Sequence, residues 1–294
     1  MRRNTTGMIV VVLACLVFCA CVGEERQVAT SAAQDAGSPS TDQPALFLIY
    51  EGGKRGYIDA TGEVIINPQF DWAWDFSEGL AAVNIGGLQT GKWGYIDKTG
   101  RYVINPLFDS AWSFSEGLAS VRIGDFATGK WGYIDKTGQF VINPQFDEAC
   151  EFSEGLAAVN IGGLQTGKWG YIDETGHYVI NPLFDFAESF SEGLAAVRIG
   201  DKRGYIDKTG RYVINPQFDG AGPFSEGLAA VRIGGWDIGK WGYIDKTDHY
   251  VINPQFDGAG RFCDGLALVW IGDKCGYIDR TGRFVWGPAP WPAD

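Results

Sequence analysis

This 294-residue sequence has few histidines and lacks the motifs of nucleophilic catalysis and metal binding. Only 2 histidines occur, His177 and His249, and they follow predicted hairpin turns at equivalent exposed positions far apart in the chain, which does not suit a shared metal site or a triad. No nucleophile motif, phosphate-binding glycine loop or zinc signature is present. We therefore predict no catalytic, cofactor-binding or metal-binding residue, and we expect the protein not to be an enzyme.

Cysteines are also few and follow no pattern. Of the 6 in the sequence, Cys15 and Cys19 lie in a predicted leader and Cys21 directly follows it. Three remain, an odd number without CxxC spacing, which excludes a disulfide framework and gives no indication of a metal site. We interpret these three as isolated thiols: Cys150, Cys263 and Cys275.

Long hydrophobic runs are missing apart from a short one near the N-terminus. Arg2 and Arg3 precede an apolar stretch from Met8 to Phe18 that is too short for a comfortable membrane span, so residues 1–20 are predicted to be a signal peptide. The junction "LVFCAC" resembles the lipobox of bacterial lipoproteins. That resemblance implies a lipidated Cys21 and an anchor in the outer membrane or cell surface, on the periplasmic or extracellular side; an ordinary signal peptidase site is the alternative.

The segment after the leader is polar, and the whole chain is acidic. Residues 21–44 are rich in Ala, Ser, Asp, Gln and Pro without hydrophobic periodicity, which predicts a flexible linker. The formal net charge is -12. Because such a surface repels nucleic acid and anionic lipid headgroups, we expect neither as a partner, and membrane contact only through the lipid anchor.

Residues 45–294 consist of repeats of one phrase. Seven copies of Gly-Tyr-Ile-Asp follow one another at spacings of 38 or 34 residues. Glu78–Asp97 is identical to Glu154–Asp173, which indicates internal duplication. A unit of this length cannot enclose a core by itself, so each must bury its apolar face against the next. We predict a single domain of seven units, whose phrase glycines are Gly56, Gly94, Gly132, Gly170, Gly204, Gly242 and Gly276.

Each unit has the pattern of short β-strands separated by turns. "GLAAVRIG" alternates small and branched apolar residues, "WGYID" is aromatic and β-branched, and "RYVINP" ends at a proline. No stretch shows a helical period. We predict an all-β fold of seven tandem antiparallel meanders that close into a seven-bladed β-propeller. An open superhelical stack is the alternative, because the first unit lacks the "FDxAxxFSEG" lead and the tail "WGPAPWPAD" supplies no clear strand to complete it.

The phrases "KWGYIDKTG", "VINPQFD" and "FSEGLAAV" recur in a fixed order, and together they resemble the WG-repeat (KWG-repeat) family. The resemblance covers all seven units. It implies a β-rich tandem array, met in exported or membrane-anchored bacterial proteins and presumed to mediate binding. It carries no catalytic residue over to this chain.

Tryptophan precedes the Gly-Tyr-Ile-Asp phrase only where a long connection comes before it. The four tryptophans follow connections such as "IGGLQTGK"; they are Trp93, Trp131, Trp169 and Trp241. The three short connections instead place Arg55, Arg203 and Cys275 at this position. We hypothesise that the indole packs under the four extra loop residues, burying apolar area worth roughly 2 kcal/mol.

The four long loops join equivalent strands, so we expect them on one rim of the array. Apolar and aromatic side chains on loops held by a rigid scaffold are typical of a binding surface. The alternative is that Phe126 and Trp236 only cover their own units. The candidate partner-binding residues are Leu88, Gln89, Thr90, Phe126, Leu164, Gln165, Thr166 and Trp236.

Acidic residues recur at three positions in the repeat. Paired carboxylates serve glycoside hydrolases, but these acids repeat around the whole array and do not mark one asymmetric site, so we interpret them as turn-capping groups. One carboxylate per turn also falls short of a calcium site. The three sets are Asp59, Asp97, Asp135, Asp173, Asp207, Asp245 and Asp279; Asp71, Asp109, Asp147, Asp185, Asp219 and Asp257; and Glu78, Glu116, Glu154, Glu192 and Glu226.

The sequence thus favours a non-enzymatic, lipid-anchored scaffold outside the cytoplasm that binds a protein of the cell envelope through its long loops. A carbohydrate-binding module is the alternative, because 11 Trp and 12 Tyr could offer stacking surfaces for sugars. A hydrolase with its active site in a propeller channel is the least favoured reading.

Overall fold

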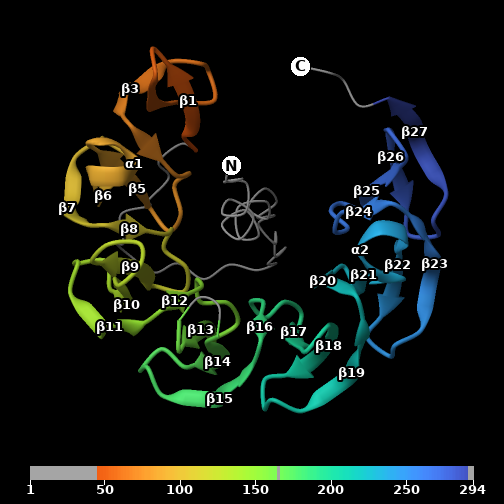
Figure 1. The fold of residues 1–294 in the computed structure, drawn as a ribbon. Helices are drawn as coiled ribbons and strands as arrows, with labels where there is room; N and C mark the ends of the chain where they lie inside the picture. The colour runs from red at the N-terminus through yellow and green to blue at the C-terminus, as the bar shows by residue number, and fades with distance from the viewer. Residues whose placement is uncertain (1–44, 164–165, 291–294) are drawn as a thin grey trace, which may run out of the picture. The chain divides into compact units, whose positions relative to one another are not determined.

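The computed structural model describes residues 45–163 and 166–290, which form seven consecutive antiparallel sheets (Figure 1). The first sheet has three strands and the other six have four, and each strand pairs with its neighbour in sequence. The predicted all-β series of antiparallel meanders is therefore confirmed. The predicted signal peptide, Cys21, the predicted linker to residue 44, Leu164 and Gln165 lie outside the described residues. No helix in the described ranges is long and apolar enough to cross a membrane.

The sheets are numbered 1 to 7 in chain order. Sheet 1 comprises β1 (Phe47–Glu51), β2 (Lys54–Ile58) and β3 (Val64–Phe70). Sheet 2 comprises β4 (Trp72–Ala73), β5 (Leu80–Ile85), β6 (Lys92–Asp97) and β7 (Tyr102–Phe108). Sheet 3 comprises β8 (Ser110–Ala111), β9 (Ala119–Ile123), β10 (Lys130–Ile134) and β11 (Phe140–Phe146). Sheet 4 comprises β12 (Glu148–Ala149), β13 (Ala157–Ile161), β14 (Lys168–Ile172) and β15 (Tyr178–Phe184).

Sheet 5 comprises β16 (Phe186–Ala187), β17 (Leu194–Ile199), β18 (Lys202–Asp207) and β19 (Tyr212–Phe218). Sheet 6 comprises β20 (Gly220–Ser225), β21 (Leu228–Ile233), β22 (Lys240–Asp245) and β23 (Tyr250–Phe256). Sheet 7 comprises β24 (Gly258–Ala259), β25 (Leu266–Ile271), β26 (Lys274–Asp279) and β27 (Phe284–Pro290). Two helices of four residues, α1 (Gly87–Thr90) and α2 (Gly235–Ile238), lie in the connections β5–β6 and β21–β22.

The turn between the last two strands of each sheet is held by its aspartate, as predicted. In sheet 2 the Oδ1 atom of Asp97 accepts hydrogen bonds from the Thr99 amide at 2.8 Å, the Thr99 hydroxyl at 2.6 Å and the Arg101 amide at 3.1 Å. Gly100 supplies the positive φ of 83° that closes this turn. Asp248 takes the same place in sheet 6 with a φ of 69°, a conformation that aspartate tolerates.

The glycine of the Gly-Tyr-Ile-Asp phrase permits a close approach between strands. The β6–β7 pairing shifts register between Trp93 and Tyr95, and a Cβ atom on Gly94 would lie 2.5 Å from the carbonyl oxygen of Ile104. No larger residue fits there without moving the β7 backbone. The shifted pairing recurs in every sheet, which explains why this glycine occurs in all seven units.

The hydrophobic core lies between the sheets rather than within them. Each of six clusters of buried side chains joins one sheet to the next. In the junction between sheets 2 and 3, the Tyr95 ring packs on Phe114 at 4.9 Å and its hydroxyl donates to the carbonyl oxygen of Trp112 at 2.8 Å. The equivalent tyrosines of sheets 1 to 6 are all fully buried: Tyr57, Tyr95, Tyr133, Tyr171, Tyr205 and Tyr243.

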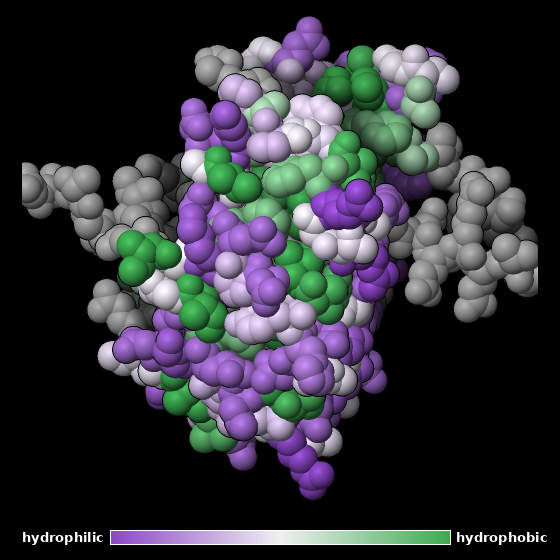
Figure 2. Space-filling view, turned by 90° about the vertical axis from the view of Figure 1, so that its right-hand side faces the viewer, coloured by the Kyte–Doolittle hydropathy of each residue, from purple (hydrophilic) through white to green (hydrophobic). Residues whose placement is uncertain are grey.

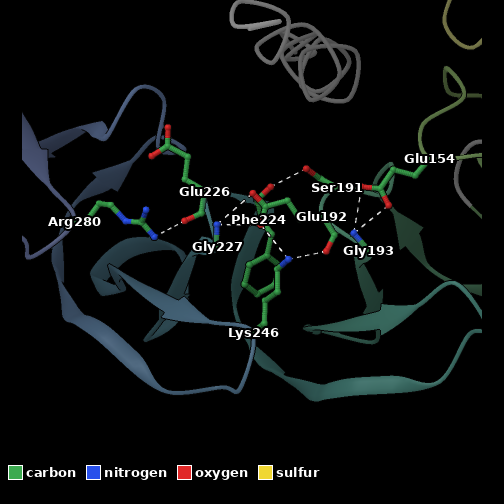
Figure 3. A network of polar contacts seen from close by, with 9 residues as sticks. All are labelled: Glu154, Ser191, Glu192, Gly193, Phe224, Glu226, Gly227, Lys246 and Arg280. Carbon is green, nitrogen blue, oxygen red and sulfur yellow. Dashed lines mark hydrogen bonds and ion pairs between the residues drawn. The ribbon is translucent and has the colours of Figure 1, made fainter. Parts of the chain in front are cut away.

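A polar network runs along the same junctions at the end of the sheets that carries the turns (Figure 3). The hydroxyl of Ser191 in sheet 5 donates to the carbonyl oxygen of Phe224 in sheet 6 at 2.7 Å. The carboxylate of Glu192 accepts from the Gly227 amide at 3.0 Å and pairs with the Lys246 ammonium at 3.1 Å. Serine and glutamate of one sheet therefore bind groups of the next one.

The outermost strands leave part of their apolar side chains in contact with solvent. On β23, Tyr250 is 40% exposed and Val251 is 45% exposed. Figure 2, which views the side that carries β23 and β27, shows hydrophobic side chains in small patches among polar ones. Scattered patches of this kind are usual on protein surfaces.

None of the six core clusters joins sheet 7 to sheet 1. Sheet 1 also lacks the short inner strand that begins every other sheet. The seven stacked sheets are thus established, whereas closure into a seven-bladed propeller stays a prediction.

Candidate functional site

The candidate site is the side of the array that carries the long connections, called the loop side below. These connections join β5 to β6, β9 to β10, β13 to β14 and β21 to β22, which are equivalent strands of their sheets. The six junctions repeat the same contacts, so equivalent strand ends point the same way. The long loops therefore emerge on one side, opposite the turns that Figure 3 shows.

The base of each loop is tied to the preceding sheet by an aspartate. Asp109 accepts a hydrogen bond from the Lys92 ammonium of sheet 2 at 2.6 Å and another from the Gly124 amide of sheet 3 at 2.9 Å. The same pattern recurs at Asp71, where the Lys54 ammonium at 2.6 Å, with the Gly86 amide, lowers the pKa of the carboxyl. These aspartates were expected to cap turns, and they instead link neighbouring sheets.

The loops themselves are ordered by glycines and short polar contacts. Gly86 has a φ of 97° before α1, and a Cβ atom on Gly91 would lie 2.3 Å from the Gly87 carbonyl oxygen. In sheet 3, Asp125 accepts hydrogen bonds from the amides of Ala127 and Thr128 at 2.9 and 2.8 Å. In these two loops the contacts hold the backbone that carries Leu88 and Phe126.

Large apolar side chains stand exposed at these tips. Leu88 on α1 is 61% exposed, Phe126 is 57% exposed and Ile238 on α2 is 83% exposed. An isoleucine at the start of this connection in sheets 2 to 7 is also 40–46% exposed. This row consists of Ile85, Ile123, Ile161, Ile199, Ile233 and Ile271.

For the other predicted partner-binding residues, the structure gives the exposure of two and the backbone position of two more. Thr90 and Thr166 are exposed, and the backbones of Gln89 and Trp236 lie in α1 and α2. Leu164 and Gln165 fall outside the described residues. Sequence reasoning missed Ile238 and the isoleucine row, although the recurring "IG" before each connection was a visible signal.

The tryptophan of the repeat lies at the junction between sheets. Trp93 is 5% exposed, belongs to the core between sheets 2 and 3, and stacks on Trp74 at 6.2 Å. In sheet 1 the arginine at this position donates to the next sheet instead, from Arg55 Nη1 to the Ala73 carbonyl oxygen at 2.9 Å. At the junction, tryptophan and arginine are thus two ways to fill the same inter-sheet position. The hypothesis that the long loop covers the indole stays a prediction.

The first strands and the segments that follow them hold partly buried acids that sequence reasoning did not single out. Burial raises the pKa of Glu151 and of Glu188, and Glu188 also pairs with the Arg203 guanidinium at 3.0 Å. Among the described residues, no three potential metal ligands gather. Cys150, Cys263 and Cys275 form no disulfide.

The remaining repeated polar residues have structural partners. His177 and His249 each contact a threonine of their own turn, Thr175 and Thr247, at 2.6 Å. The glutamates of "SEG" bind the next sheet, as Glu154 does with the Gly193 amide at 3.0 Å. The six fully buried tyrosines of the phrase are unavailable for stacking on a sugar.

A family model described as a WG containing repeat matches six segments of the chain, residues 56–88, 93–125, 131–164, 169–202, 204–235 and 241–275. No curated protein matches the sequence. Among solved structures, one from a study of two prolyl endopeptidases has a TM-score of 0.50 at 10% identity, over 80% of this chain and 46% of that one.

Two further solved structures are similar at low identity. Hsv2p of Kluyveromyces lactis has a TM-score of 0.49 at 12% identity, over 81% of this chain and 87% of that one. An acylaminoacyl peptidase of Pyrococcus horikoshii has a TM-score of 0.46 at 9% identity, over 84% of this chain and 53% of that one. The chain spans about half the length of the two peptidase structures, and the likeness concerns the fold alone.

Proposed function

Because the chain belongs to the family of WG-containing repeats, we propose that it is a non-enzymatic scaffold that binds a protein partner through its loop side. The observation that carries this proposal is the exposure of Leu88, Phe126 and Ile238 on ordered loops. Exposed apolar anchors on a rigid frame lose little conformational entropy on binding, which is the usual basis of protein recognition.

The isoleucine row extends this surface between the loop tips. Ile199 and Ile271, 46% and 41% exposed, lie in the sheets with short connections, so apolar contacts continue where the long loops are missing. The lysine–aspartate pairs at the loop bases supply a polar border. An apolar centre with a polar rim is the arrangement that protein interfaces use.

We also propose that the scaffold works outside the cytoplasm, held by a lipid on Cys21 in the outer membrane or at the cell surface. The support is the leader, the lipobox-like junction and the polar segment before residue 45. Replacing Cys21 by serine should release the protein from the membrane fraction. A Cys21→Ser protein that stays in that fraction would contradict the anchor.

The binding proposal is tested with three substitutions on the loop side. The full chain, in wild-type form and as the combined variant Leu88→Ser, Phe126→Ser and Ile238→Ser, is used to capture proteins from envelope extract, and a captured protein is identified, purified and titrated. We expect the triple variant to raise its Kd by at least about tenfold.

The matched control replaces apolar residues of the outer strands. Leu107→Ser, Leu183→Ser and Val251→Ser change side chains that are 62%, 62% and 45% exposed, and they should leave the Kd unchanged. Equal losses in both variants would overturn the assignment of the loop side. Saturable binding on a glycan array, with no protein captured, would favour the carbohydrate-binding alternative.

A further inference from the structure

The array ends in two sheet faces that are built like a junction but remain uncovered. On sheet 7, Tyr277 is 42% exposed, whereas the six equivalent tyrosines are fully buried. Trp286, which pairs with Tyr277 across β26 and β27 as Ile104 pairs with Tyr95, is 52% exposed. Ile104 is only 5% exposed. The last sheet therefore presents an aromatic face that no described residue covers.

Sheet 1 presents the other side of such a junction, the face that in an internal sheet packs against the preceding sheet. Phe47 pairs with Ile58 as Ala81 pairs with Ile96 in sheet 2, so Phe47 occupies the position that faces the preceding sheet. Phe47 is 50% exposed and Ala81 is fully buried. Ile49 and Ile58 are partly exposed beside it, at the positions of the buried Val83 and Ile96.

These two faces are the two partners of the interface that the chain repeats six times. In each internal junction, a tyrosine and an isoleucine of one sheet pack against a small residue, a valine and an isoleucine of the next, as Tyr95 and Ile104 do against Ala119, Val121 and Ile134. Sheet 7 offers the first set through Tyr277 and Trp286. Sheet 1 offers the second through Phe47, Ile49 and Ile58.

The end sheets differ from the internal ones in ways that suit an apolar contact. Sheet 1 lacks the inner strand and with it the phenylalanine that packs on the tyrosine, but it carries an extra ring at Phe47, where the internal sheets have alanine. The polar network is not continued, because Ala60 stands in place of the turn lysine and Asp264 in place of the glutamate. A contact between the face of sheet 7 and the face of sheet 1 would therefore depend on hydrophobic burial and be reversible.

The six internal junctions leave little freedom for sheet 7 to reach sheet 1 of its own chain. The distance from the tyrosine hydroxyl to the carbonyl oxygen is 2.6–2.8 Å in all of them. The tyrosine and phenylalanine ring centroids are 4.8–4.9 Å apart throughout. Closing the chain on itself would have to alter these packed contacts, whereas a second copy can approach freely.

We propose that sheet 7 of one chain docks against sheet 1 of a second copy, in the register of the internal junctions. The contact joins different surfaces of the two copies, so it is heterologous and can be repeated to form longer assemblies. It covers Tyr277 and Trp286 of the first copy with Phe47 of the second. The loop sides of successive copies then lie on the same side, and one assembly presents several binding surfaces.

The test uses the full chain in detergent and measures its sedimentation over a range of concentrations. We expect the wild-type chain to form dimers and larger species as the concentration rises. Phe47→Arg and Trp286→Arg should each raise the Kd of association by at least about tenfold, because each places a charge in an apolar contact. Leu107→Arg, on a residue of the outer strand β7 that is 62% exposed, is the control and should associate like the wild type.

Mixing the two end variants identifies the head-to-tail geometry. Phe47→Arg retains an intact sheet 7 and Trp286→Arg an intact sheet 1, so together they should form a heterodimer with the wild-type Kd that grows no further. A Phe47→Arg chain that still dimerises alone would overturn the proposal in favour of contact between two copies of sheet 7. A wild-type chain that stays monomeric throughout would overturn it in favour of closure within one chain or cover by its own segment before residue 45.

Discussion

The hydroxyl of Tyr133 in sheet 3 donates a hydrogen bond to the carbonyl oxygen of Cys150 in sheet 4 at 2.7 Å. Tyr133 is fully buried, so this bond satisfies a backbone carbonyl that water cannot reach from the tyrosine side. The same bond crosses every junction between consecutive sheets. It shows that each unit is completed by the one after it.

Replacing Tyr133 by phenylalanine should lower the free energy of unfolding by about 1–2 kcal/mol, because the carbonyl of Cys150 loses its donor while the ring still fills the core. The matched control is Tyr277→Phe, whose hydroxyl has no hydrogen-bond partner in the described part of the chain. Measured by urea denaturation of dilute protein, Tyr277→Phe should leave stability unchanged. Equal losses at both positions would contradict the role of the inter-sheet bond.

Glu174 occupies the turn position that carries a lysine in sheets 2, 3, 5 and 6. The lysines of sheets 3, 5 and 6 pair with a glutamate of the preceding sheet, as Lys136 does with Glu78 at 3.0 Å, whereas Glu174 faces the junction that contains Glu116. Glu174→Lys should therefore add about 0.5–1 kcal/mol to the free energy of unfolding at low salt, a modest gain because the pair is exposed.

The gain from Glu174→Lys should shrink as salt screens the new pair. Lys136→Glu, the reverse change at the equivalent turn, should lower stability by a similar amount. Urea denaturation at low and high salt measures both. A gain that does not depend on salt would show that another effect of the lysine side chain is responsible.

Trp93→Ala should lower the free energy of unfolding by about 3 kcal/mol, since it removes a buried indole from the core between sheets 2 and 3. Trp93→Arg should cost less, because Arg55 and Arg203 already hold this position in two sheets by donating to the next sheet. The measurement is chemical denaturation, with limited proteolysis of the loop around Leu88 as a second readout. Faster loop cleavage without a loss of global stability would show that the indole supports the loop and not the junction.

Glu151 provides a test of pH dependence. Burial raises its pKa above 4.5, so the folded state holds the proton more tightly than the unfolded chain, and stability falls as the pH rises from 4.5 through the folded pKa. Glu151→Gln should raise the Tm at neutral pH and have little effect below about pH 4.5. The exposed Glu63→Gln is the control, with no change expected at either pH. A Glu151→Gln gain that persists unchanged in acid would contradict burial of the charge as its cause.

Much of the fold could be predicted from the sequence because its signals are local. The aspartate and glycine around Lys98 define a turn within four residues, and the alternation in "GLAAVRIG" defines a strand. The prediction that units bury their cores against each other also followed from length alone. These features need no knowledge of which residues meet across a junction.

The roles of the other repeated residues could not be predicted because their partners are far away in sequence. Glu154 binds an amide of sheet 5, and Asp109 joins a lysine of one sheet to the loop of the next. Both were interpreted as turn residues, since only the stacking geometry brings their partners near. The junction contacts of Trp93 were not predicted for the same reason: its correlation with loop length is visible in the sequence, but its neighbours in the core come from distant segments.

The identity of Glu78–Asp97 with Glu154–Asp173 has a consequence for how the array can change its length. Both stretches lie at the same place in their units, so a genetic exchange between them would delete or add two whole units. The tyrosine of the joined unit would still meet a backbone carbonyl oxygen of the next sheet, as Tyr95 and Tyr171 both do. The array can therefore change its length by whole units in a single recombination event. Selection for a longer array, or for more binding surfaces on one chain, then acts directly on the number of repeat units.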